Sequence, residues 1–321
     1  MRIDAPAASA PPARLPWVDQ ARGFAILAMV VYHFSWDLSF FRLIETDVGE
    51  AFGWRLFARL IAGSFLFLVG FSLVLATRGG IRWRPYLRRL ALVAAAAAAI
   101  TIVTWFVFPE SFVFFGILHH IAVASVLGLA FVRAPLWLVA LAALGAAAAP
   151  ALFAAPAFDH PALLWLGLYT EPPMSNDYVP LLPWFAAVLL GIVAARVLAG
   201  RLVAAGTGAP GPAGRGLVWL GRHSLAIYLV HQPVLFGSML ALQAFGAWTP
   251  AVEREFVGNC VAACVATARD EATCRRACPC VLGEIKASGI WDAVRSGLLS
   301  DEDQQIYADA ARQCFAGEGA R

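Results

Sequence analysis

The first hydrophobic segment of the chain, residues 17–41, is long enough to cross a membrane, yet it carries four ionisable side chains. About 20 apolar residues span the hydrocarbon core of a bilayer. Ionisable side chains inside a spanning helix are costly, and those that persist usually face the protein interior and serve a function. The four are Asp19, Arg22, His33 and Asp37. They constrain both the fold, a bundle of membrane helices, and the place where a site should lie.

The spacing of these residues puts Arg22, His33 and Asp37 on one face of a helix. Arg22 and His33 are eleven positions apart, about three helical turns, so they share a face and lie ~16 Å apart along the axis. His33 and Asp37 are an i,i+4 pair, in which the carboxylate can orient the imidazole and raise its basicity. The spacing favours a cation near one membrane surface and a His–Asp base near the other. The alternatives are an Arg22 that anchors the helix at the headgroups and a His33 that hydrogen-bonds a neighbouring helix.

The composition is that of a polytopic membrane protein. Of the 321 residues, 60% are hydrophobic and 14% charged, and the mean hydropathy is +0.71, which excludes an ordinary soluble domain. We therefore expect an all-α transmembrane helix bundle of about seven spans over residues 17–246, after a disordered cytosolic N-terminus rich in Ala and Pro at residues 1–16. The seven apolar segments are residues 17–41, 54–77, 86–108, 111–132, 135–155, 181–200 and 217–246.

The distribution of arginine around the segments predicts their topology, because cytoplasmic loops of membrane proteins carry an excess of Lys and Arg. Under strict alternation the loops on one side receive Arg78, Arg82, Arg84, Arg88, Arg89, Arg133, Arg196, Arg201, Arg215 and Arg222, and these loops hold no acidic residue. We expect that side to be cytoplasmic, with the N-terminus inside and the C-terminus outside. The chain would then be a multi-pass protein of a bacterial inner membrane, with lipid around it and no nucleic-acid partner.

All six cysteines lie in the polar C-terminal tail, residues 253–321, which we expect to be a small periplasmic helical unit stapled by disulfides. Cys260 and Cys264 are an i,i+4 pair, and so are Cys274 and Cys278. Two antiparallel helices would pair Cys260 with Cys278 and Cys264 with Cys274, leaving Cys280 for Cys314, although six cysteines allow fifteen connectivities. A zinc site is the alternative, but the C-x₃-C spacing and an oxidising compartment count against it. We expect no bound metal.

Four stretches together resemble one known family. They are the Arg–Gly pair of the first segment with His33 after it, FGILHHIAVAS at 115–125, DYVPLLPWFAAVLLG at 177–191 and LGRHSLAIYLVHQP at 220–233. The combination is similar to the heparan-α-glucosaminide N-acetyltransferase-like family of bacterial membrane proteins, related to membrane acyltransferases with the same first-helix motif. The resemblance covers residues 14 to about 246. Larger relatives have more spanning helices than the seven counted here, and nothing in the chain names the acceptor.

The resemblance implies transfer of an acyl group, in the first place acetyl, from cytosolic acetyl-CoA to an amine or hydroxyl of an extracytoplasmic glycan. His33 would act as general base or accept the acyl group itself, and Asp37 would orient it. The residues expected to hold the phosphates of acyl-CoA are Arg22, Arg88, Arg89, Arg222 and His223. Those expected near the acceptor are His119, Asp177, Tyr178 and His231. At most one of the adjacent His119 and His120 is expected on the His33 side.

Two other functions fit the same residues. Intramembrane Arg, His and Asp side chains also make proton relays, so a proton-coupled transporter or channel is the main alternative. The two halves of the chain show no internal repeat of the kind that many transporters have. A non-catalytic scaffold whose working part is the disulfide-bonded tail is the other alternative. The sequence leaves open whether the chain forms homo-oligomers.

Overall fold

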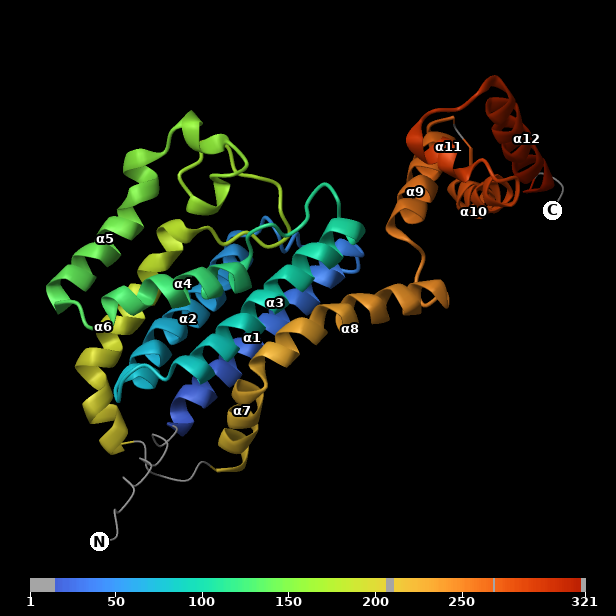
Figure 1. The fold of residues 1–321 in the computed structure, drawn as a ribbon. Helices are drawn as coiled ribbons and strands as arrows, with labels where there is room; N and C mark the ends of the chain where they lie inside the picture. The colour runs from blue at the N-terminus through green and yellow to red at the C-terminus, as the bar shows by residue number, and fades with distance from the viewer. Residues whose placement is uncertain (1–14, 206–210, 268, 319–321) are drawn as a thin grey trace, which may run out of the picture. The chain divides into compact units, whose positions relative to one another are not determined.

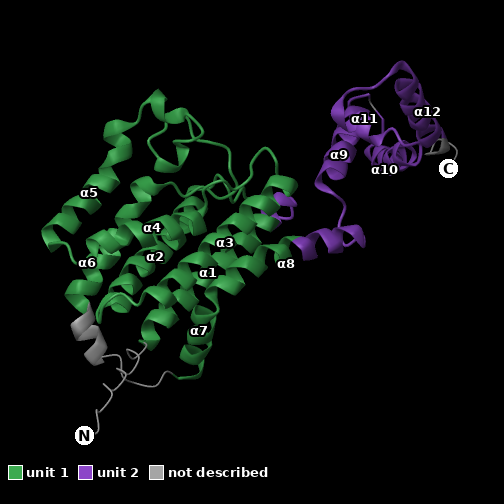
Figure 2. Cartoon of the chain, viewed as in Figure 1, with its two compact units in different colours: residues 1–37, 46–236 green, residues 38–45, 237–321 purple. Residues whose placement is uncertain are grey.

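The computed structural model describes residues 15–205, 211–267 and 269–318, and all regular structure in these ranges is helical. Residues 1–14, most of the segment expected to be disordered, lie outside the described ranges. The chain divides into two compact units (Figures 1 and 2). One contains residues 1–37 and 46–236, and the other residues 38–45 and 237–321.

Six of the described helices are long and apolar enough to cross a membrane, and a seventh apolar helix is shorter. The expected bundle of about seven spans is therefore confirmed as a polytopic helical architecture. The long helices are α1 Pro16–Phe40, α2 Phe52–Thr77, α3 Trp83–Val107, α5 Leu136–Phe153, α6 Leu181–Ala205 (of which Leu181–Leu198 is the apolar part) and α8 Ser224–Ala244. The short one is α4 Ile117–Phe131, with 15 residues.

Two of the expected segments differ from the helices observed. The apolar run at 111–132 becomes helical only at Ile117, because α3 ends just before Pro109 and the residue preceding a proline avoids the helical conformation. The run at 217–246 is two helices, since His223 (φ −100°, ψ 13°) separates α8 from α7, Pro212–Arg222. Pro212 opens α7 at a position where the missing N–H costs nothing.

Glycine holds α2 and α6 together at the centre of the membrane unit. A Cβ on Gly70 would lie 1.9 Å from the carbonyl oxygen of Val188, and one on Gly191 would lie 2.0 Å from that of Phe67. In lipid the hydrophobic effect does not drive helices together, so close backbone approach at small residues takes its place. Around this crossing Leu66, Val188, Leu189 and Ile192 are almost completely buried.

A second glycine contact joins α1 to α7. A Cβ on Gly23 would lie 2.0 Å from the carbonyl oxygen of Leu217, and one on Gly221 would lie 1.8 Å from that of Asp19. Each glycine thus rests against the backbone of the other helix. The contact fixes the N-terminal turns of α1 beside the C-terminal turn of α7.

The other unit is a small helical domain with three disulfides. Its helices are α9 Ala251–Ala266, α10 Glu271–Ala287, α11 Trp291–Ser296 and α12 Asp301–Glu318. The bonds are Cys260–Cys278, Cys264–Cys274 and Cys280–Cys314, the connectivity that the spacing favours. Their core contains Val281, Ile285, Ile290 and Ala310.

Local hydrogen bonds complete this unit. Ser300 and Asp303 cap the start of α12 reciprocally, since the backbone N–H of each donates to the side chain of the other. The guanidinium of Arg254 donates to the carbonyl groups of Phe41 and Arg42. These bonds explain why residues 38–45 belong to this unit, although residues 38–40 are the end of α1.

The glycine crossing of α2 and α6 gives a stability prediction. Gly70→Ala should destabilise the bundle by about 1–3 kcal/mol, because the new methyl group forces the two backbones apart. Gly63→Ala on the same helix is the matched control, since its Cβ would meet nothing nearer than a ring atom of Trp184 at 3.9 Å. In detergent, Gly70→Ala should melt at a lower temperature than Gly63→Ala. Equal melting temperatures would show that the crossing of α2 and α6 accommodates an extra methyl group.

Candidate active site

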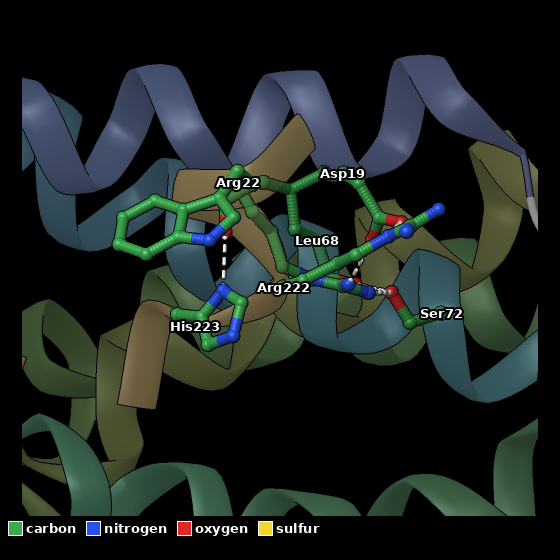
Figure 3. Close-up of polar contacts among 7 residues, drawn as sticks. Asp19, Arg22, Leu68, Ser72, Arg222 and His223 are labelled. Carbon is green, nitrogen blue, oxygen red and sulfur yellow. Dashed lines mark hydrogen bonds and ion pairs between the residues drawn. The ribbon is translucent and has the colours of Figure 1, made fainter. Parts of the chain in front are cut away.

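The N-terminal turns of α1 contribute to a charged cluster centred on Asp19 (Figure 3). Arg22 donates to Asp19 Oδ1 at 2.9 Å and to the hydroxyl of Ser72 on α2 at 2.6 Å. Arg222 at the end of α7 approaches the other carboxylate oxygen, with Nε 3.4 Å from Oδ2. The α1–α7 glycine contact brings these groups together, because Gly23 follows Arg22 and Gly221 precedes Arg222.

This cluster has an excess of positive charge. Two guanidinium groups share the single carboxylate of Asp19, whose side chain is 10% exposed, whereas the side chain of Arg222 is 49% exposed. His223 lies beside Arg222 and is exposed, and its Nδ1 is 2.8 Å from the carbonyl oxygen of Trp219. The arrangement suits an anion that reaches the cluster from the Arg222 side.

The other two arginines expected at the donor site lie apart from this cluster. Arg88 and Arg89 are exposed residues in the first turns of α3. Within the described residues neither arginine makes a hydrogen bond or an ion pair with Asp19 or Arg222. Arg88 lines a shallow hollow with Arg84 and Pro85. Of the five residues that the sequence predicted for phosphate binding, the structure brings Arg22, Arg222 and His223 together.

A second polar cluster lies farther along α1, where His33 meets α8. The imidazole rings of His33 and His231 are 4.8 Å apart between centroids and inclined at 63°. One residue beyond His231, the side-chain amide of Gln232 donates to Asp37 Oδ1 at 2.7 Å. Asp37 is completely buried.

The expected hydrogen bond between His33 and Asp37 is not formed within the described residues. Asp37 instead takes the amide of Gln232 as its partner, so its carboxylate connects α1 to α8 rather than to the imidazole one turn away. The i,i+4 spacing puts both side chains on one face, but it does not decide which donor a buried carboxylate takes when another helix offers one. The partner of His33 in the structure is His231.

The orientation of His231 is fixed by a chain of hydrogen bonds that crosses three elements. Its Nδ1 lies 2.7 Å from the carbonyl oxygen of Tyr228, one turn earlier on α8. The hydroxyl of Tyr228 donates to Asp177 Oδ2 at 3.2 Å, and the same oxygen accepts the backbone N–H of Ile117, the first residue of α4, at 3.0 Å. Gly116 makes room for this carboxylate, since a Cβ there would lie 2.3 Å from Oδ2.

Asp177 therefore accepts hydrogen bonds from Ile117 and Tyr228, two partners that the sequence did not reveal. Burial raises the pKa of its carboxyl group, and the bonds from Ile117 and Tyr228 oppose that rise. The carboxylate caps the N-terminus of α4, where the helix leaves backbone N–H groups without partners. Tyr178 has a related role, since its hydroxyl donates to the carbonyl oxygen of Leu164 at 2.6 Å and holds the loop before α6.

The two adjacent histidines of α4 make hydrogen bonds away from His33. His119 Nε2 is 3.1 Å from the hydroxyl of Thr101, and its Nδ1 accepts the N–H of Gly116 at 3.2 Å. His120 is completely buried, with Nδ1 3.2 Å from the carbonyl oxygens of both Val179 and Pro180.

Sequence reasoning missed Gln232, Ser72 and the central part played by Asp19. Gln232 had a detectable signal, a second polar side chain next to His231 in an apolar run. Ser72 had none, because only the packing of α2 against α1 brings it to Arg22. No group of three or more His, Cys, Asp or Glu side chains placed to hold a metal ion occurs in the described part of the chain.

Comparison with known proteins supplies a family for this arrangement. The family model described as "Heparan-alpha-glucosaminide N-acetyltransferase, catalytic" matches residues 14–233. The match contains all residues of both polar clusters and ends before the disulfide-bonded helices. Comparison with curated proteins gives no match, and comparison with solved structures gives none.

Proposed function

Because the chain belongs to the heparan-alpha-glucosaminide N-acetyltransferase family, we propose that it transfers an acetyl group from cytosolic acetyl-CoA to an amine or hydroxyl of a glycan on the opposite side of a bacterial inner membrane. The observation that carries this proposal is the placement of two polar clusters on one helix. Arg22 lies in a cluster with excess positive charge, and His33 lies about three turns farther along α1, ~16 Å away.

The donor end is the cluster around Asp19. Guanidinium groups bind phosphate oxygens in a planar, two-pronged geometry, and acetyl-CoA carries several phosphate charges. Arg222 offers N–H donors on its exposed side, while Arg22 contributes charge and holds Asp19 and Ser72 in place. His223 lies next to Arg222, and Arg88 and Arg89 add positive charge on α3. The arginine distribution supports a cytoplasmic location for this end.

The reacting end is the pair of imidazoles. The acceptor attacks the carbonyl carbon of the acetyl group, a C–N or C–O bond forms, and the C–S bond breaks with its electron pair on the CoA sulfur. His33 either takes the proton that the acceptor loses or first carries the acetyl group on a ring nitrogen. No cysteine lies in residues 1–259, so a thiol nucleophile from the membrane bundle is excluded.

Asp37 is a positioning residue in this proposal. Its bond to Gln232 fastens α1 to α8 next to the place where His33 meets His231. The acceptor would enter between these helices and the loop that Asp177 and Tyr178 shape, with His119 at the rim. In this proposal α4 crosses the membrane together with the six long helices, so the C-terminal tail lies on the acceptor side.

The donor role of Arg22 can be tested by kinetics. Arg22→Ala should raise the apparent KM for acetyl-CoA about tenfold to hundredfold, because a charged contact to phosphate is worth about 1.5–3 kcal/mol. The KM for the acceptor should stay nearly constant. Arg55→Ala removes a surface arginine that pairs with Glu50 and is the matched control. An unchanged KM for acetyl-CoA in a well-folded Arg22→Ala protein would remove Arg22 from the donor site.

The reacting histidine can be tested separately. His33→Ala should abolish transfer of labelled acetyl from acetyl-CoA to glucosamine, since no other side chain of α1 can replace an imidazole. His160→Ala changes an exposed histidine that accepts the N–H of Ala162 in a loop, and its activity should equal that of the wild type. Melting temperatures in detergent show whether each variant is folded. Near-normal turnover by a folded His33→Ala protein would refute the proposed mechanism.

A further inference from the structure

Three polar atoms beside His33 are buried and have no hydrogen-bond partner among the described protein atoms. They are Nε2 of His231, Oδ2 of Asp37 and Oε1 of Gln232. Unpaired buried polar atoms cost free energy, so those that a structure retains call for an explanation. Two of the three, the oxygens of Asp37 and Gln232, accept hydrogen bonds and never donate while Asp37 is ionised.

The third atom is an acceptor as well. The Nδ1 of His231 lies 2.7 Å from the carbonyl oxygen of Tyr228, and a carbonyl oxygen only accepts, so Nδ1 carries the proton. In a neutral imidazole the other nitrogen then holds a lone pair. Nε2 of His231 is therefore a base, and its position against the ring of His33 places it at the reacting group.

We propose that His231 is the general base that takes the proton from the acceptor, while His33 carries the acetyl group. This inference rests on the proposed acetyltransferase function and divides its chemistry between two residues. Deprotonating the acceptor leaves His231 as an imidazolium, whose Nδ1–H bond to the Tyr228 carbonyl strengthens when the ring is charged. The backbone carbonyl thus has the orienting role that a carboxylate has in a Ser-His-Asp triad.

The proposed reaction takes place in two steps. A ring nitrogen of His33 attacks the acetyl carbon of acetyl-CoA, an N–C bond forms, and the C–S bond breaks to release the CoA thiolate. The acceptor then attacks the same carbon, its proton passes to Nε2 of His231, and the bond to His33 breaks with its electron pair returning to the imidazole. The net reaction moves one acetyl group and one proton, the latter ending on the CoA sulfur.

The ring contact also explains why a neighbouring histidine is useful here. An acetyl group on His33 must be attacked from the space next to its ring, and His231 occupies a flank of that space, inclined at 63°. The unpaired oxygens of Asp37 and Gln232 accept further hydrogen atoms of the acceptor and hold it there. The acceptor therefore satisfies the three buried atoms when it binds.

The decisive variant is His231→Asn, because an asparagine amide can still donate to the Tyr228 carbonyl but has no basic nitrogen in place of Nε2. With acetyl-CoA and glucosamine as probes, kcat should fall about 10²–10⁴-fold. The KM for acetyl-CoA should fall with it, so that kcat/KM for acetyl-CoA stays unchanged, because only the second step is slowed. Label from acetyl-CoA should accumulate on the protein, since the first step needs no base from α8. In His231→Ala, added imidazole should restore part of the rate. His160→Asn is the matched control.

The possible results distinguish failure of the proposed role of His231 from failure of the proposed acetyltransferase activity. Near-wild-type turnover by a folded His231→Asn protein, or loss of turnover without labelled protein, would overturn the role of His231. Full recovery by asparagine would show that only the bond to Tyr228 matters. If the wild-type protein transfers no acetyl group to amines or hydroxyls, the proposed function fails, whatever the variants show.

Discussion

The close backbone contact between α1 and α7 is the constraint on which the charged cluster around Asp19, the proposed donor end, depends. Gly23 and Gly221 each lie against a carbonyl of the other helix, so neither position tolerates a side chain. Their sequence neighbours Arg22 and Arg222 are thereby brought to opposite oxygens of Asp19. Two cations around one buried carboxylate leave a net positive charge, which the proposed anionic donor would recognise.

Paired polar groups also hold together the cluster around His33, the proposed reacting end. Water is scarce between membrane helices, so a polar side chain there either finds a partner or is stabilised by what the site binds. Asp37 finds Gln232, and Tyr228 finds Asp177. Nε2 of His231, Oδ2 of Asp37 and Oε1 of Gln232 find none. Satisfied bonds thus fasten the helices, and these three unsatisfied acceptors belong to the place where we propose that the acceptor binds.

The helices and the disulfides could be predicted from the sequence, because both follow from the geometry of a single helix or of a helix pair. The Arg22–His33 interval and the apolar runs indicated a membrane helix with two polar ends. The i,i+4 cysteines favoured the disulfide connectivity that the tail has. What failed was the choice of partners. Nothing in the spacing of His33 and Asp37 shows that Gln232, 195 residues later, competes for the carboxylate, or that Ser72 reaches Arg22. The break at His223 was also missed, although Arg222, His223 and Ser224 interrupt the apolar run there.

The central claim is that donor and acceptor meet α1 from opposite sides of the membrane. Sealed membrane vesicles of either orientation, made from cells that express the protein, test it directly. When labelled acetyl-CoA is added outside inverted vesicles loaded with glucosamine, we expect acetylated glucosamine inside. Right-side-out vesicles should give product only after they are permeabilised. Transfer that requires acetyl-CoA and glucosamine on the same side would contradict the account.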